Sequence, residues 1–181
     1  MRIAVSGTHG VGKSTLVDEF LCTHAEFVHE PEPYAVLVED YGEEFSAEPC
    51  VEDFLRQLEF NLERLGQHDA RENVIYERCP LDFLAYLTAL DANVSETLRE
   101  RISEATQHLD LIVYLPLDDS FGNDEFPKLR RSVDRHLSEI LTAASVVVIE
   151  ATGSTTQRLR AVENQLISKT QPGDASQRIT S

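Results

Sequence analysis

The chain contains 181 residues, of which 41% are hydrophobic and 27% are charged, a composition typical of a soluble globular domain. The 32 acidic residues outnumber the 16 basic ones, so the formal net charge is −16. A surface this acidic repels nucleic-acid backbones and anionic membranes, and we expect the protein to bind neither.

The apolar runs and the cysteines indicate where the protein resides. No apolar run has the length that a membrane span needs, and the first residues follow a strand pattern directly. Cys22, Cys50 and Cys79 lie far apart and form no C-x-x-C pair, which favours free thiols in a reducing compartment. We therefore expect a cytoplasmic protein.

Apolar runs alternate with helical patterns along the chain, which predicts an α/β protein with a largely parallel sheet. In chain order, the predicted elements are strand 2–6, helix 14–23, strand 26–30, helix 51–66, strand 73–77, helix 81–90, helix 94–108, strand 111–115, helix 128–143, strand 145–150 and a last helix that ends near residue 169. The acidic segment 116–126 has no periodicity and is predicted to be a mobile loop. The pattern indicates one domain over 1–169 and a flexible tail over 170–181.

A phosphate-binding loop is predicted between the first strand and the first helix. Residues 7–15 read GTHGVGKST and contain the complete spacing G-x-x-x-x-G-K-S. The glycines let the backbone point its N–H groups at phosphate oxygens, and the helix N-terminus adds partial positive charge. Lys13 is expected to reach the β- and γ-phosphates, and the Ser14 hydroxyl to bind Mg²⁺. The residues predicted to contact the nucleotide are Gly7, His9, Gly10, Val11, Gly12, Lys13, Ser14 and Thr15.

The other strand ends distinguish among the classes of P-loop protein. A switch GTPase would carry an NKxD motif that reads guanine, and the sequence contains none, which favours ATP as the nucleotide. A motor or AAA-type ATPase would usually end an apolar strand in Asp-Glu, and neither VIYER nor LIVYLPLDD does so. These patterns disfavour hydrolysis that is coupled to switching or to mechanical work.

Four segments resemble thymidylate kinases and deoxyribonucleoside kinases, in the right order. FVHEPEPYAVL (27–37) resembles their Glu-Pro segment, and VIYERCPLDFLAYL (74–87) resembles their third strand, which ends in Asp-Arg or Glu-Arg. DLIVYLPLDD (110–119) resembles their fourth strand, and VVVIEATGSTTQRLRAV (146–162) resembles the last strand and the adenine loop. The chain is also similar to bacterial P-loop proteins that group with ribosylnicotinamide kinases and are often labelled ATPases.

This resemblance implies a fold and its accessory parts. It implies a P-loop NTPase of three layers, α/β/α, with a five-stranded parallel sheet in the order 2-3-1-4-5 and a small lid at about 118–136. It places Thr152 and Gly153 in the loop that lies against adenine. Dimers are common among these relatives, so a homodimer is compatible with the resemblance.

The resemblance also assigns roles around the transferred phosphate. Glu30 is the candidate base that takes a proton from the acceptor, and its neighbour Glu32 is the alternative. Glu77 is expected to hold Mg²⁺ opposite Ser14, and Arg78 to bridge the acceptor and the phosphoryl group.

The next helix and the lid carry further candidates. Asp82 either contacts the acceptor or caps the helix at 81–90, and the cap is the simpler interpretation. Lys128, Arg131 and Arg135 share one side of the helix at 128–143, with Arg130 adjacent. Arg131 and Arg135 are the candidates to close over the triphosphate, unless this side is merely solvated.

Side chains near the second strand and on the helix at 51–66 are candidates for the acceptor pocket, with core packing as the alternative for the aromatic ones. They are Tyr34, Phe54, Gln57, Phe60 and Asn61.

The sequence thus predicts an ATP- and Mg²⁺-dependent phosphotransferase that acts on a small acceptor, a nucleoside or a nucleotide. The alternative is a regulatory P-loop ATPase that hydrolyses ATP with a protein partner. A scaffold without catalysis is disfavoured because Lys13 and Ser14 are both present.

Overall fold

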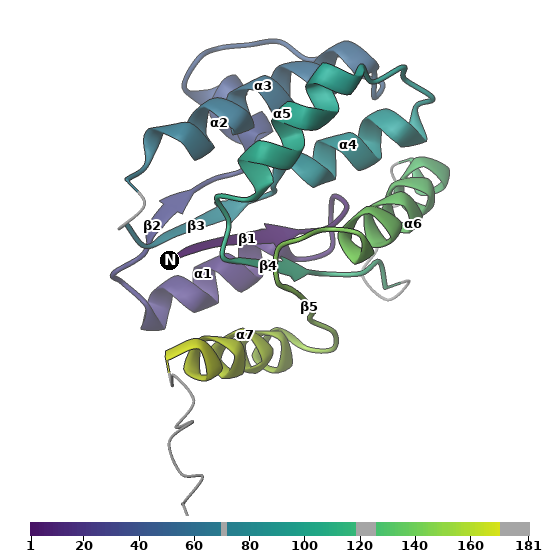
Figure 1. Cartoon of the computed structure of the whole chain (residues 1–181). Helices are drawn as coiled ribbons and strands as arrows, with labels where there is room; N and C mark the ends of the chain where they lie inside the picture. Colours follow the sequence, from purple (N-terminus) through teal and green to yellow (C-terminus); the bar gives the residue numbers. More distant parts are fainter. Residues whose placement is uncertain (70–71, 119–125, 171–181) are drawn as a thin grey trace, which may run out of the picture.

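The computed structural model describes residues 1–69, 72–118 and 126–170 (Figure 1). Part of the predicted lid, at 119–125, and the predicted tail from residue 171 onward lie outside the described residues.

A parallel sheet of five strands forms the centre of the described structure. The strands are β1 (Arg2–Ser6), β2 (Val28–Glu30), β3 (Val74–Glu77), β4 (Leu111–Tyr114) and β5 (Val148–Glu150). Their order is β2-β3-β1-β4-β5, and every neighbouring pair is parallel. The order and direction confirm the predicted sheet, and they bring the carboxyl ends of all five strands to one edge (Figure 1).

Helices cover both faces of the sheet. They are α1 (Lys13–Thr23), α2 (Pro33–Glu39), α3 (Val51–Gln67), α4 (Pro80–Ala89), α5 (Glu96–Thr106), α6 (Pro127–Thr142) and α7 (Thr155–Thr170). Figure 1 shows α1 and α7 on one side of the sheet and the remaining helices on the other side and at its end. In the described residues no helix is long and apolar enough to cross a membrane.

The alternation of side chains along the strands divides the core in two. Ile3 and Val5 of β1 pack with α1 and α7, whereas Ala4 between them packs with Tyr76 and the helices of the other face. All five residues of β1 are buried, because this central strand has helices on both sides. The loop that follows β1 therefore begins from a rigid position.

Helix α2 is absent from the sequence prediction. It has only seven residues, too few to show a helical period, and it begins at Pro33, whose φ suits the first helical position. Two residues separate β2 from α2, and the second of them, Glu32, is the N-cap of the helix.

A group of charged side chains fastens β2 to α3. The guanidinium of Arg64 contacts the carboxylate of Glu30, and its Nη1 donates to the carbonyl of Pro31 at 2.7 Å. The imidazole of His68 lies 2.5 Å from Glu30 Oε1 and 2.7 Å from Glu72 Oε2. Burial alone would lower the pKa of His68, but its hydrogen bonds to the two carboxylates raise it above the ordinary value.

Gly7 is the first residue after β1, and its backbone conformation and surroundings leave no room for a side chain. Its φ is +147°, and an added Cβ would lie 2.5 Å from the carbonyl oxygen of Leu115. We predict that Gly7→Ala lowers the free energy of unfolding by at least about 2 kcal/mol, measured by urea titration. Gly66→Ala is the matched control, because that Cβ would meet nothing within 4 Å. An equal effect of the two substitutions would contradict the prediction.

The raised pKa of His68 makes stability depend on pH. The imidazolium contributes fully below the ordinary histidine pKa of 6.5, and this contribution is lost as pH rises through the raised pKa of the folded protein. We predict that His68→Gln destabilises the protein most at the acid end of this window, and that the difference from wild type shrinks at higher pH. Urea titrations of both proteins across the window test this, and a difference independent of pH would contradict it.

Candidate active site

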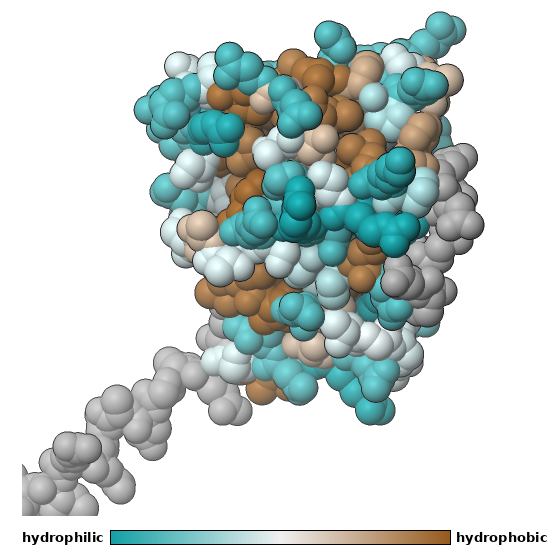
Figure 2. All heavy atoms as spheres, turned by 90° about the vertical axis from the view of Figure 1, so that its right-hand side faces the viewer, coloured by the Kyte–Doolittle hydropathy of each residue, from teal (hydrophilic) through white to brown (hydrophobic). Residues whose placement is uncertain are grey.

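The loop between β1 and α1 forms the centre of the candidate site. It occupies the carboxyl end of β1, on the face that Figure 2 shows, where hydrophilic side chains form a band across the middle. Lys13 is buried, and its Nζ folds back to donate to the carbonyl of Thr8 at 2.8 Å. Burial, aided by the nearby charge of Arg78, lowers the pKa of Lys13 to about 8. The ammonium is thus held across the loop, where phosphate oxygens would be cradled.

Ser14 and Glu77, the predicted magnesium pair, are in contact. The Ser14 hydroxyl donates to Glu77 Oε2 at 2.6 Å, and Glu77 Oε1 lies 3.0 Å from Nε2 of His29. A hydroxyl beside a carboxylate is a donor set that suits Mg²⁺. Among the residues that the structure describes, no three His, Cys, Asp or Glu side chains are grouped for a metal ion.

Arg78 joins the phosphate loop to a second carboxylate. Its Nε donates to Glu32 Oε1 at 2.5 Å, and its Nη1 donates to the carbonyl of Gly7 at 3.1 Å. The backbone of Arg78 has φ +75°, a left-handed conformation that is costly for a residue with a side chain. Although burial alone would raise the pKa of Glu32, Arg78 and Lys13 outweigh it and lower this pKa to about 2. Glu32 is therefore ionised, and it holds the guanidinium in place.

Asp82 fastens the loop to α4. Its Oδ1 accepts from the backbone N–H of Gly7 at 2.9 Å, and its Oδ2 accepts from the Ser6 hydroxyl at 2.5 Å. Oδ2 also accepts from the backbone N–H of Cys79, at the start of α4, at 2.9 Å. The N-cap of α4 is Cys79, and Asp82, three residues later, completes a capping box with it, so Asp82 stabilises the helix start as a capping-box partner and not as the cap itself. The same carboxylate also fixes the first amide of the phosphate loop.

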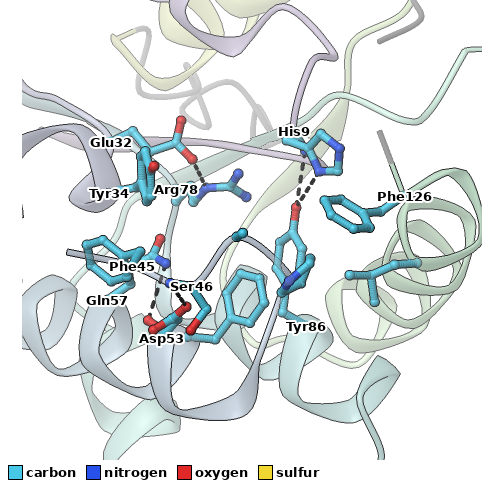
Figure 3. A pocket seen from close by; sticks show the side chains of 14 residues that line it. His9, Glu32, Tyr34, Phe45, Ser46, Asp53, Gln57, Arg78, Tyr86 and Phe126 are labelled. Atoms are coloured by element: carbon cyan, nitrogen blue, oxygen red, sulfur yellow. Dashed lines mark hydrogen bonds and ion pairs between the residues drawn. The ribbon is translucent and has the colours of Figure 1, made fainter. Parts of the chain in front are cut away.

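A cavity of about 350 Å³ opens beside Arg78 (Figure 3). Its lining residues come from the phosphate loop, the α2 region, the segment before α3, α3, α4 and the start of α6. They are His9, Glu32, Tyr34, Phe45, Ser46, Ala47, Pro49, Asp53, Phe54, Gln57, Arg78, Tyr86, Phe126 and Leu129. A volume of this size is at the small end for ligand pockets.

The walls of the cavity are mainly aromatic. The rings of Phe54 and Tyr86 are stacked, with centroids 4.3 Å apart, and those of Tyr34 and Phe45 are 5.1 Å apart. The Tyr86 hydroxyl lies 3.3 Å from Nδ1 of His9, which places the phosphate loop at the rim of the cavity (Figure 3). Such walls favour a flat ligand that can stack on them.

Polar groups line the floor of the cavity between these rings. Gln57 is buried on α3 and donates from Nε2 to the backbone carbonyl of Asp53 at 3.2 Å. The Asp53 carboxylate accepts from the backbone N–H of Ser46 at 2.9 Å, which holds the preceding loop against α3. Tyr34, Phe54 and Gln57 thus line the cavity as predicted, together with loop residues that the sequence analysis missed.

Glu30, the candidate base of the sequence analysis, lies outside the cavity lining. Its side chain projects toward α3, where Arg64 and His68 engage its carboxylate, and it does not line the cavity. In β2, Glu30 is in register with Tyr76, whose side chain packs on the same face of the sheet. Glu32, the alternative of the sequence analysis, lies at the cavity beside Arg78 instead.

Two other pocket candidates also lie elsewhere. Phe60 packs under the guanidinium of Arg64, with 5.3 Å from Cζ to the ring centroid. Asn61 is buried and donates to the backbone carbonyl of Arg78 at 3.5 Å. Both face the protein interior, as the core alternative predicts for Phe60.

The basic residues of α6 lie on different sides of the helix. Arg131 and Arg135 are exposed, whereas Arg130 is buried and lies against the phosphate loop. A Cβ on Gly10 would lie 3.6 Å from Arg130 Nη2. Arg130 lies three residues before Val133, which is buried in α6. This spacing places the two side chains on the same face of the helix, and it was the signal in the sequence that Arg130 points inward.

The loop after β5 approaches the same site. Thr152 and Gly153 are exposed there, and Arg158 of α7 donates from Nη1 to the carbonyl of Val11 at 2.6 Å. Arg158 was not among the predicted site residues, because nothing in the sequence separates it from the other basic residues of α7.

Comparisons with solved structures place this fold among known ones. Deoxyadenosine kinase from M. mycoides, solved with the products dCMP and dCDP, matches with a TM-score of 0.62 and 17% identity over 93% of this chain and 100% of that chain. Thymidylate kinase from Candida albicans matches with a TM-score of 0.65 and 16% identity, over 93% and 92% of the two chains. The YorR protein of Bacillus subtilis, in complex with phosphorylated GDP, matches with a TM-score of 0.62 and 15% identity, over 94% and 98%.

At these identities the likeness shows a shared fold, that of P-loop nucleoside and nucleotide kinases, which the sequence resemblance predicts. No curated protein matches the sequence. A family model described as an AAA domain matches residues 2–158. Since this match spans most of the 181 residues, the chain belongs to that family of AAA-domain proteins.

Proposed function

We propose that the protein transfers the γ-phosphoryl group of ATP to a small, flat acceptor of the nucleoside or nucleotide type. The observation that carries this proposal is the ion pair between Arg78 and Glu32, which stands between the phosphate loop and the aromatic cavity. A protein that only hydrolyses ATP has no need of a second, ring-lined cavity beside its phosphate loop.

The donor end of the reaction belongs to the phosphate loop. Lys13, together with the loop amides, would bind the β- and γ-phosphates, and Arg130 and Arg158 lie close enough to the loop to add positive charge. Ser14 and Glu77 would hold Mg²⁺, which supplies charge that offsets the negative charge of the phosphates during transfer. His29 contacts Oε1 of Glu77 through its Nε2 atom, and this contact orients the carboxylate.

The acceptor end belongs to Glu32, Arg78 and the aromatic walls. Arg78 presents its planar guanidinium to the space between the two substrates, and Glu32 fixes its direction. We assign to Glu32 the role of base that the sequence resemblance gave to Glu30. A triphosphate bound at Lys13 offsets the positive charge that keeps the Glu32 pKa low, so the carboxylate becomes more basic when ATP is bound.

The stacked rings explain why the acceptor should be flat. Stacking of a base on an aromatic side chain contributes roughly 1–3 kcal/mol per base and tolerates different bases. Gln57, buried at the floor, supplies an amide that can hydrogen-bond to the edge of a ring.

The proposed function predicts transfer rather than hydrolysis. With ATP and Mg²⁺, a panel of nucleosides, nucleotides and nicotinamide riboside should contain at least one acceptor that yields a phosphorylated product together with ADP. Product formation is measured by chromatography, with ATP alone as the control. If ADP formation stays at background with every acceptor and rises only with a protein partner, the regulatory ATPase is the correct function.

The two neighbouring glutamates allow a matched comparison. We predict that Glu32→Gln lowers kcat at least about 100-fold while the affinity for an ATP analogue is retained, because the carboxylate acts on the acceptor. Glu30→Gln should leave kcat within a few-fold and lower the melting temperature instead, since Glu30 holds Arg64 and His68. A loss of turnover in Glu30→Gln with normal turnover in Glu32→Gln would reverse the assignment.

A further inference from the structure

We infer that the acceptor atom is a hydroxyl oxygen of a molecule without negative charge, and that the cavity discriminates against the same molecule bearing a phosphate. This inference rests on the proposed function and narrows it to one of the two acceptor chemistries that the fold accommodates.

The charges that line the cavity carry the inference. Of the described lining residues, Glu32 and Asp53 carry carboxylates, and Arg78 is the only arginine or lysine. Arg78 and Lys13 keep Glu32 ionised by lowering its pKa. The wall therefore carries two carboxylates against one guanidinium, and a phosphate dianion brought into it meets like charge.

The guanidinium of Arg78 already interacts with groups of the protein itself. It donates to Glu32 and to the carbonyl of Gly7, and it lies over the ring of Tyr86, with 5.3 Å from Cζ to the centroid. A nucleoside monophosphate needs cations that stay with its own phosphate in addition to those that stabilise the transferred group. Arg78 is the one arginine or lysine in the described lining, and its Nε and Nη1 already donate to Glu32 and to the Gly7 carbonyl, so an acceptor phosphate would have to compete for it.

Five cations of the phosphate loop and the surrounding helices are directed elsewhere. Lys13, Arg130 and Arg158 contact or lie against the phosphate loop, on the donor side, and none of them lines the cavity. On α3, Arg56 donates from Nε to Glu43 at 3.0 Å, and Arg64 is bound to Glu30. Lys13, Arg130 and Arg158 thus lie at the phosphate loop, while the cavity is lined mainly by rings, with the two carboxylates and Arg78 as its acidic and basic groups.

A carboxylate at this position suits a hydroxyl. A phosphate acceptor is already ionised at neutral pH and needs no base, whereas a hydroxyl must lose its proton. In the step we infer, the hydroxyl oxygen attacks the γ-phosphorus of ATP and its proton passes to the Glu32 carboxylate. The bond between the γ-phosphorus and the bridging oxygen breaks, and its electron pair leaves with ADP.

Asp53 is the residue that can be varied to test the discrimination. Its carboxylate lies on the cavity wall and accepts a hydrogen bond from the backbone N–H of Ser46 at 2.9 Å. Asn in its place retains an oxygen that can accept this bond and removes the negative charge. Glu100→Gln, on the exposed face of α5, removes the same charge far from the cavity and serves as the control.

The experiment compares each nucleoside with its own 5′-monophosphate as acceptor for the full chain, at fixed ATP and Mg²⁺, by kcat/KM. We expect a ratio of at least about 100 in favour of the nucleoside, as like charges strongly disfavour a wrong partner. Asp53→Asn should lower this ratio at least threefold by improving the monophosphate, while Glu100→Gln leaves it unchanged.

The outcomes separate the inference from the function on which it rests. Equal or faster transfer to the monophosphates overturns the hydroxyl inference and leaves the phosphotransferase intact. Transfer to neither member of any pair overturns the proposed function itself. If Asp53→Asn leaves the nucleoside preference unchanged, the negative charge of Asp53 does not contribute to the discrimination.

Discussion

The buried carboxylate of Asp82 is the interaction on which the site depends. It is fully buried, and it accepts hydrogen bonds from the hydroxyl of Ser6, the amide of Gly7 and the amide of Cys79. A carboxylate without water is stable only when its oxygens are satisfied in this way. Because the three donors come from the end of β1, the phosphate loop and the start of α4, one side chain fixes the loop relative to the helix that forms the cavity wall. The Asp82 carboxylate therefore fixes both the phosphate loop and the helix that lines the cavity.

Strand alternation then decides which glutamates belong to the site. Glu77 lies one residue after Tyr76 in β3 and therefore points to the face of α1, where it meets Ser14. Glu30 is in register with Tyr76 and points to the opposite face, where a carboxylate needs the compensation that Arg64 and His68 provide. Glu32 lies beyond the end of β2, at the first turn of α2, and is free of this alternation. It can therefore reach Arg78.

The sheet and the phosphate loop were predictable because their signals are local. Apolar runs and the GTHGVGKST spacing are read from neighbouring residues, and the strand order followed from resemblance. The acceptor side was less predictable, since it depends on contacts between distant segments: Phe45 and Ser46 join the cavity only because their loop folds onto α3. Likewise Arg130, rather than Arg131, faces the loop because of the packing of α6, which the charge pattern alone could not reveal.

The excess of acidic residues has a consequence for how this site works. In a chain with a net charge of −16, cations at this edge of the sheet are held by carboxylates or carbonyls, as Arg78 is by Glu32 and Lys13 is by Thr8. Such partners hold the cations in position before a nucleotide arrives, which reduces the ordering that binding requires. A triphosphate must displace or share them, and it can do so because it brings several charges at once. An acceptor with a single phosphate brings fewer, so under the proposed function an arrangement that admits a triphosphate would resist a charged acceptor.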